Sequence, residues 1–115
     1  MDQPISIDEH NITMLDFRKQ GIDRLFEMGC DEKALISDRV AALVCVLEVG
    51  DMKMSKELRT SPMSRNFRDA AEQDGVHLRA RKAASLAALH AMSADATLDN
   101  KSRNLAQRAL RRFSA

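Results

Sequence analysis

The side chains that most often perform catalysis or hold metal ions are few in this sequence, and their spacing is irregular. His10, His77 and His90 show no regular spacing with acidic residues or cysteines, and Cys30 and Cys45 form no CxxC pair. Structural zinc sites usually take their ligands in close pairs. The chain also carries no glycine-rich phosphate loop, HExxH or GxSxG motif. We therefore predict no catalytic residue, no metal site and no cofactor, and expect a protein that is not an enzyme. We interpret Cys45 as a core residue and the histidines as surface or partly buried residues.

Basic residues are the more informative group, because arginine and lysine supply most of the non-specific affinity of proteins for DNA. On the last predicted helix they recur at i, i+7 and i+11, which places them in one strip beside the apolar face. Arginine and asparagine also make bidentate contacts to guanine and adenine. The candidate contacts to a nucleic acid or another anionic partner are Lys53, Lys56, Arg59, Arg65, Asn66, Arg68, Arg79, Arg81, Lys82, Lys101, Arg108 and Arg112. The alternative interpretation is an ordinary solvated face, with some of these bases paired to the acidic first helix.

The net charge of +1 hides an asymmetry along the chain. Residues 1–38 hold nine acidic and four basic residues, whereas residues 51–115 hold seven acidic and thirteen basic residues. A chain polarised in this way binds an anionic partner or pairs its own halves, within one chain or between two. Because most soluble oligomers are symmetric dimers, we expect a homodimer, antiparallel or head-to-tail.

Helix signals follow one another along the chain. Ser6 to Glu9 fits a capping box, and Gly29 fits a left-handed C-cap after it. Asp31 can cap a second helix that stops at Gly50, and this central helix is apolar around most of its circumference. Ser61-Pro62 starts another helix that ends at Gly75. These signals predict helices over about 6–28, 31–49, 52–59, 62–75 and 76–92, a loop over 93–97 with Asp95 as a possible cap, and a last helix carrying Leu98, Leu105, Ala109 and Phe113.

The composition agrees with an all-α fold. Aromatic residues make up only 3% of the chain, and it holds four glycines and two prolines, which disfavours strands and leaves few helix breaks. The length suits one domain over residues 1–115. We expect a single compact domain of about five or six helices without an internal repeat. The longest apolar run, Val40 to Leu47, is too short to cross a membrane, and the acidic N-terminus is unlike a signal peptide. We therefore expect a cytoplasmic protein that does not insert into membranes.

The helices predicted over 32–74 follow an order similar to the Trp-repressor helix-turn-helix. The apolar register argues against the motif. If Met54 and Leu58 are the core positions of its first helix, the buried position of the second falls at Arg65. A register that buries Phe67 instead places Glu57 where a small core residue belongs. The helix-turn-helix therefore stays a hypothesis.

Together these features indicate a small regulatory protein that acts by binding macromolecules. A DNA-binding transcriptional regulator that uses its basic C-terminal half is marginally favoured. The alternative is a module that binds a partner protein as an antagonist, adaptor or secretion-type chaperone. The failed motif register favours this alternative, and the charge asymmetry favours DNA.

Overall fold

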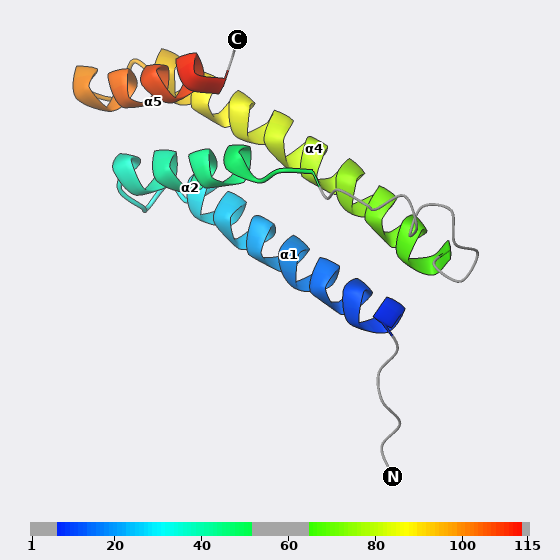
Figure 1. Cartoon of the computed structure of the whole chain (residues 1–115). Helices are drawn as coiled ribbons and strands as arrows, with labels where there is room; N and C mark the ends of the chain where they lie inside the picture. Colours follow the sequence, from blue (N-terminus) through cyan, green and yellow to red (C-terminus); the bar gives the residue numbers. More distant parts are fainter. Residues whose placement is uncertain (1–6, 52–64, 114–115) are drawn as a thin grey trace.

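The computed structural model describes residues 7–51 and 65–113. These residues form four helices: α1 (Ile7–Cys30), α2 (Ile36–Glu48), α4 (Arg65–Ala94) and α5 (Asn100–Phe113) (Figure 1). The all-α class is confirmed. The expected count of five or six helices is too high for the described part of the chain, which has four. The helix predicted over 52–59 lies outside the described residues, as does Ser6 of the predicted capping box.

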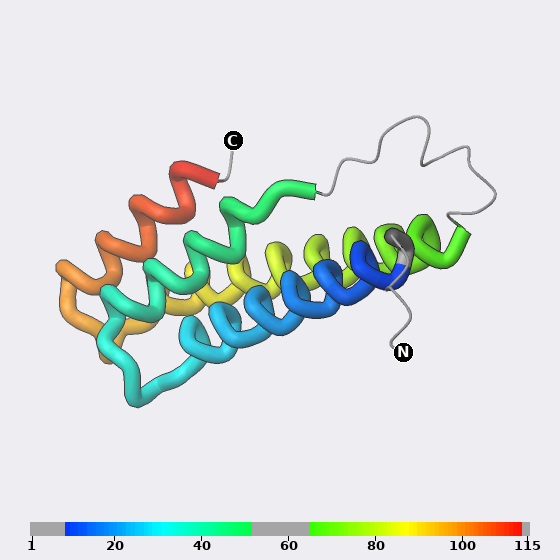
Figure 2. Tube along the Cα trace, turned by 60° about the horizontal axis from the view of Figure 1, so that its bottom comes forward, coloured from blue at the N-terminus to red at the C-terminus, as the bar shows by residue number. Residues whose placement is uncertain are grey.

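The four described helices run in two opposite directions. The long helices α1 and α4 run side by side in the same direction. The short helices α2 and α5 return in the opposite direction and lie over the C-terminal halves of the long helices (Figures 1 and 2). Each long helix is therefore followed by a short antiparallel partner. Helix α2 packs against α1, α4 and α5, and α4 likewise packs against the three other described helices. Helix α2 therefore shares with α4 the central place that was predicted for it alone.

Gly75 does not end a helix, so the predicted break between 62–75 and 76–92 is wrong. Helix α4 runs without interruption through Gly75, and no described glycine has a positive φ. An isolated glycine costs a helix only about 1 kcal/mol relative to alanine. The packing of α4 along α1, which is the most extensive helix contact of the structure, offsets that cost.

Gly29 is a packing residue and not the predicted left-handed cap. It lies inside α1, which continues to Cys30, and it is buried. A Cβ atom at Gly29 would lie 2.4 Å from Cδ2 of Leu43 on α2, closer than real Cβ atoms approach another atom. The sequence therefore has glycine here because α2 crosses α1 at close range.

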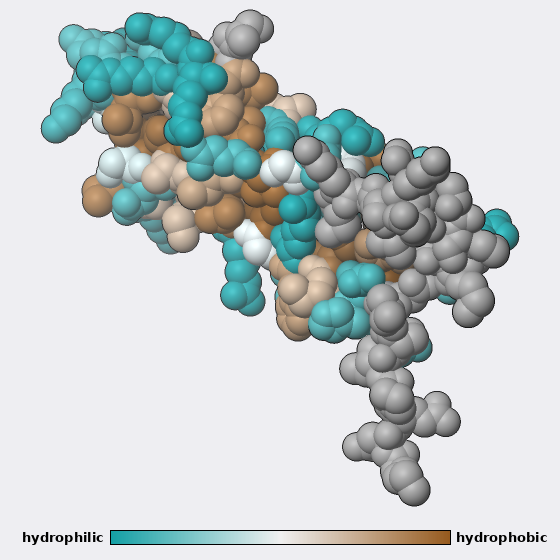
Figure 3. All heavy atoms as spheres, in the orientation of Figure 1, coloured by the Kyte–Doolittle hydropathy of each residue, from teal (hydrophilic) through white to brown (hydrophobic). Residues whose placement is uncertain are grey.

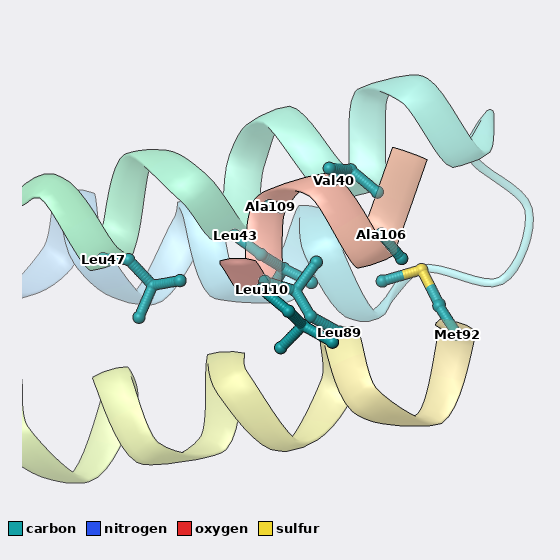
Figure 4. Packing of buried hydrophobic residues seen from close by; sticks show 8 residues of the cluster. All are labelled: Val40, Leu43, Leu47, Leu89, Met92, Ala106, Ala109 and Leu110. Atoms are coloured by element: carbon teal, nitrogen blue, oxygen red, sulfur yellow. The ribbon is translucent and has the colours of Figure 1, made fainter. Parts of the chain in front are cut away.

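Helix α2 begins later than predicted, at Ile36 instead of after Asp31, with Leu35 at its N-cap. Its buried residues form the main core with residues of α4 and α5, as Figure 4 shows; the members of that core are Val40, Leu43, Leu47, Leu89, Met92, Ala106, Ala109 and Leu110. Cys45 faces solvent on the opposite side of α2, so its interpretation as a core residue is wrong. The histidines fit their interpretation, with His77 partly buried and the other two exposed.

The loop between α1 and α2 has the same pattern of hydrogen bonds as the loop between α4 and α5, although no repeat is visible in the sequence. The aspartate that follows each long helix accepts a hydrogen bond from the backbone N–H two residues later, at 3.0 Å for Asp31 and 2.9 Å for Asp95. Equivalent residues differ by 64 in number: α1 ends at Cys30 and α4 at Ala94. Three backbone hydrogen bonds also recur with this offset. After α1 they run from Asp31 N to Met28 O, from Ala34 N to Asp31 O and from Arg39 N to Leu35 O. After α4 they run from Asp95 N to Met92 O, from Leu98 N to Asp95 O and from Arg103 N to Asp99 O.

The described residues thus form two units with the same helix–loop–helix arrangement, α1–α2 and α4–α5. The second long helix packs against both helices of the first unit, and the two short helices pack against each other. The expectation of no internal repeat is therefore corrected. The sequence hides the repeat because only a few equivalent positions keep the same residue.

Helix α5 is capped by Asp99 and not by Asp95. The Asp99 carboxylate accepts a hydrogen bond from the backbone N–H of Ser102 at 2.7 Å. Hydrogen bonds from the Ser102 side chain and backbone lower the pKa of Asp99. A depressed pKa in the folded state contributes stability above the ordinary carboxyl pKa, and this contribution is lost as the pH falls through the lower, folded-state value.

We predict that Asp99→Ala reduces the loss of stability in acid. In the native protein the free energy of unfolding should fall as the pH drops below about 4, near the ordinary pKa of aspartate. The variant should be less stable at neutral pH and show a smaller fall. Urea titrations at several pH values measure both effects. Ser102→Ala should give an intermediate slope because the backbone N–H still donates, and an unchanged slope in both variants would contradict this account.

Candidate anion-binding surface

The exposed side of α5 is a continuous basic stripe. Lys101, Asn104, Arg108 and Arg111 follow one another at i, i+3, i+7 and i+10, and all four are exposed. They lie opposite the buried side of the helix, which carries Ala106, Ala109 and Leu110. The helix contains no acidic residue. Figure 3 shows hydrophilic side chains covering this end of the molecule.

None of the three cations of this stripe forms an ion pair among the described residues, although the charge of Lys101 adds to the Ser102 hydrogen bonds in lowering the pKa of Asp99. Arg112, at the edge of the same helix, differs: its Nη2 forms an ion pair with Oε1 of Glu48 on α2, and its guanidinium lies over the ring of Phe113. Arg111 and Arg112 also stand in the last turn, where cations complement the helix dipole. Because Arg111 is exposed, this local role leaves its guanidinium accessible to a ligand.

Arg81 belongs to the interior seam between α1 and α4. Its Nε donates to Oδ1 of Asp23 at 3.0 Å, and its guanidinium lies over the ring of Phe26, 4.7 Å from the centroid. His77 Nε2 lies 2.9 Å from the same carboxylate oxygen. The interpretation that some bases pair with the acidic first helix is therefore confirmed for Arg81, and this residue is not a free anion contact.

A second ion pair joins the two long helices, and here the basic residue lies on α1 and the acidic residue on α4. Arg18 on α1 donates through Nε to Oδ2 of Asp74 on α4 at 3.3 Å, and the Asp74 side chain is only 4% exposed. Arg18 also donates through Nη2 to the carbonyl oxygen of Gly50. Oδ1 of Asp74 has no hydrogen-bond partner among the described residues. The pair joins α1 to α4, and removing Arg18 would leave the buried Asp74 carboxylate without a compensating charge.

The other candidate residues do not join the α5 stripe. Arg65 and Asn66 are exposed at the start of α4, which is about 35 Å along the helix from the part that packs against α5. Arg68 is half-buried near that start. Farther along α4, Arg79 is exposed and Lys82 is half-buried. Lys53, Lys56 and Arg59 lie outside the described residues. The structure therefore brings together Lys101 and Arg108, with Arg112 at the edge, and leaves the other candidates elsewhere.

The residues that sequence reasoning missed are Asn104 and Arg111. The helical spacing of the stripe was sufficient to find both, had the strip been extended to i+3 and i+10. The repeat gives a second signal. The core residues Val40, Leu43 and Leu47 of α2 correspond to Asn104, Gln107 and Arg111 of α5. The positions at which α2 packs against α4 and α5 are thus polar and basic in α5.

A metal site and a membrane-spanning helix have less support in residues 7–51 and 65–113. There, no group of three or more histidine, cysteine, aspartate or glutamate side chains is placed to hold a metal ion. None of the helices in these ranges is long and apolar enough to cross a membrane. No protein-family model, curated protein or solved structure matches the chain.

Proposed function

We propose that the protein binds the phosphate backbone of duplex DNA through the basic stripe of α5. The observation that supports this proposal is the stripe itself: three exposed cations on an acid-free helix face, none of them in an ion pair among the described residues. Arginine and lysine on a rigid element contact several phosphates together, and each contact releases condensed counterions. The binding that we propose is electrostatic and depends little on sequence.

The dimensions of α5 suit a duplex. Its 14 residues span about 21 Å, and the major groove, about 12 Å wide, admits an α-helix. The basic stripe from Lys101 to Arg111 covers about 15 Å of that length. Asn104, in the middle of the stripe, has an amide that can form hydrogen bonds with a base edge or a phosphate. Arg112 contributes less because Glu48 neutralises it.

The test is fluorescence anisotropy with a labelled 20-base-pair duplex at several salt concentrations. Native protein should bind most tightly at low salt. Replacing Arg108 and Arg111 together with alanine should flatten the plot of log affinity against log salt by about two units, since each phosphate contact contributes about 0.9. It should also weaken binding to unrelated duplexes by a similar factor.

The matched control is Lys19→Ala combined with Lys33→Ala, which removes the same charge from exposed positions of the first unit. This control should keep most of the affinity and of the salt slope. Equal losses in both double variants would mean that net charge and not the stripe drives binding. No binding at low salt would exclude DNA. Binding of polyglutamate in that case would assign the stripe to an acidic protein partner, the second class of ligand expected from the sequence.

A further inference from the structure

A small hollow lies between the two long helices, in the N-terminal half of each. Its volume is about 100 Å³, which is the space of about three water molecules. Ile12 and Leu15 of α1 and Ala70 of α4 form apolar parts of its wall, and Asp74 of α4 supplies a carboxylate. The hollow therefore combines an apolar wall with a charged group that can hold a ligand.

The Asp74 carboxylate has one oxygen without a partner. Its side chain is only 4% exposed, and Oδ2 accepts the hydrogen bond from Arg18. Oδ1 has no hydrogen-bond partner among the described residues. A buried acceptor without a donor costs free energy, so nearly all such groups in proteins are satisfied. Because Asp74 lines the hollow, a donor held inside the hollow can satisfy Oδ1.

The charges around the hollow favour a positively charged donor. Asp16 and Lys19 also line it, and both are exposed, so their opposite charges largely offset one another in water. Arg18 approaches Asp74 from the side of Oδ2 and also donates to the carbonyl oxygen of Gly50, which leaves Oδ1 to another donor. Hydrogen bonds from an ammonium group to a carboxylate are about twice as strong as those between neutral groups.

We propose that this hollow binds the ammonium group of a small primary amine. The ammonium group donates one hydrogen bond to Oδ1 of Asp74. Its two other N–H groups face the Asp16 carboxylate, the Gln73 amide oxygen or water at the mouth of the hollow. The short alkyl group of the amine packs against the apolar wall. An organic cation fits better than a metal ion, because a metal ion needs oxygen or nitrogen ligands on most sides. The volume suits about three or four non-hydrogen atoms, as in ethylamine.

A nuclear magnetic resonance titration of the full chain with ethylamine hydrochloride tests this proposal. A ligand of this size binds with a dissociation constant of about 1 mM or weaker. The backbone amide signals of residues 12–19 and 70–77 should shift and saturate, relative to sodium chloride at the same ionic strength. Ethanol has the same number of non-hydrogen atoms without the charge and should bind at least about tenfold more weakly. Acetate, which donates no hydrogen bond to Asp74, should cause no saturable shift.

Two substitutions test whether the hollow itself is the site. Ala70→Leu fills the hollow without changing any charge and should abolish the saturable shifts. Its matched control is Ala80→Leu, the same change at an exposed position of α4, which should leave binding intact. Asp74→Asn keeps the shape of the side chain, removes its charge and should raise the dissociation constant at least about tenfold. Circular dichroism verifies that each variant is folded, and if Asp74→Asn is not, the Ala70 variant decides.

A titration with glycine identifies the source of the ammonium group. Glycine adds a carboxylate that Lys19 can meet at the mouth of the hollow, so tighter binding of glycine assigns the site to an amino acid. Tighter binding of ethylamine assigns it to a simple amine. The proposal is overturned if neither compound gives saturable shifts up to about 100 mM. Equal binding of ethanol, or full binding by Ala70→Leu, overturns it as well.

Discussion

Replacing Leu43 with alanine should lower the free energy of unfolding by about 2–5 kcal/mol, the range for large-to-small changes in a core. The Leu43 side chain is fully buried at the centre of α2. It contacts the backbone of α1 at Gly29 and belongs to the cluster shared with α4 and α5. A cavity at this point loosens α2 from all three of its neighbours. Urea denaturation followed by circular dichroism gives the free energy.

The control for this substitution is Leu35→Ala. Leu35 lies a short distance before Leu43 in the same chain but is 70% exposed at the N-cap of α2. The same chemical change should therefore alter the free energy of unfolding by less than about 0.5 kcal/mol. Similar losses at both positions would contradict the placement of Leu43 in the core.

Gly29→Ala should destabilise the protein by about 1–3 kcal/mol, the usual cost of overpacking a well-filled interior. The added methyl group would collide with the Leu43 side chain, so α1 and α2 must separate or Leu43 must leave its rotamer. Thermal and urea unfolding measure the loss.

The same substitution elsewhere in α1, Gly21→Ala, should raise the free energy of unfolding instead of lowering it. A Cβ atom at Gly21 meets nothing within 4 Å, so the variant should gain about 0.5–1 kcal/mol from helix propensity alone. If both variants were stabilised, the close crossing of α1 and α2 at Gly29 would be wrong.

The helical class and most helices could be predicted from the sequence because apolar periodicity and loop chemistry are local. The Asp95 to Thr97 loop is one example, since its hydrogen bonds lie within three residues. The glycines show where local reasoning ends. Gly29 and Gly75 both indicate helix stops. Helix α1 does end one residue after Gly29, at Cys30, but Gly29 serves the close approach of α2 and forms no left-handed cap, whereas α4 runs through Gly75 because α1 supports it. Both reasons are tertiary.

The candidate surface was predictable to a similar degree. Helical spacing alone placed Lys101 and Arg108 in one strip. It did not show that Asp23 holds Arg81 or that Glu48 holds Arg112, because the partners are distant in sequence. The repeat was not visible either, because equivalent positions exchange apolar for polar residues, as Leu43 does with Gln107.

The division into two like units also orders the folding process. Contacts inside a unit join residues close in the chain, such as Gly29 and Leu43, whereas the seam joins Arg18 to Asp74, 56 residues away. Closing a loop four times as long costs about 1.2 kcal/mol more in chain entropy. Chain entropy therefore favours the contacts inside each helical hairpin over the contacts across the seam. Until the two hairpins meet, the residues with which α2 packs against α4 and α5 stay exposed to water.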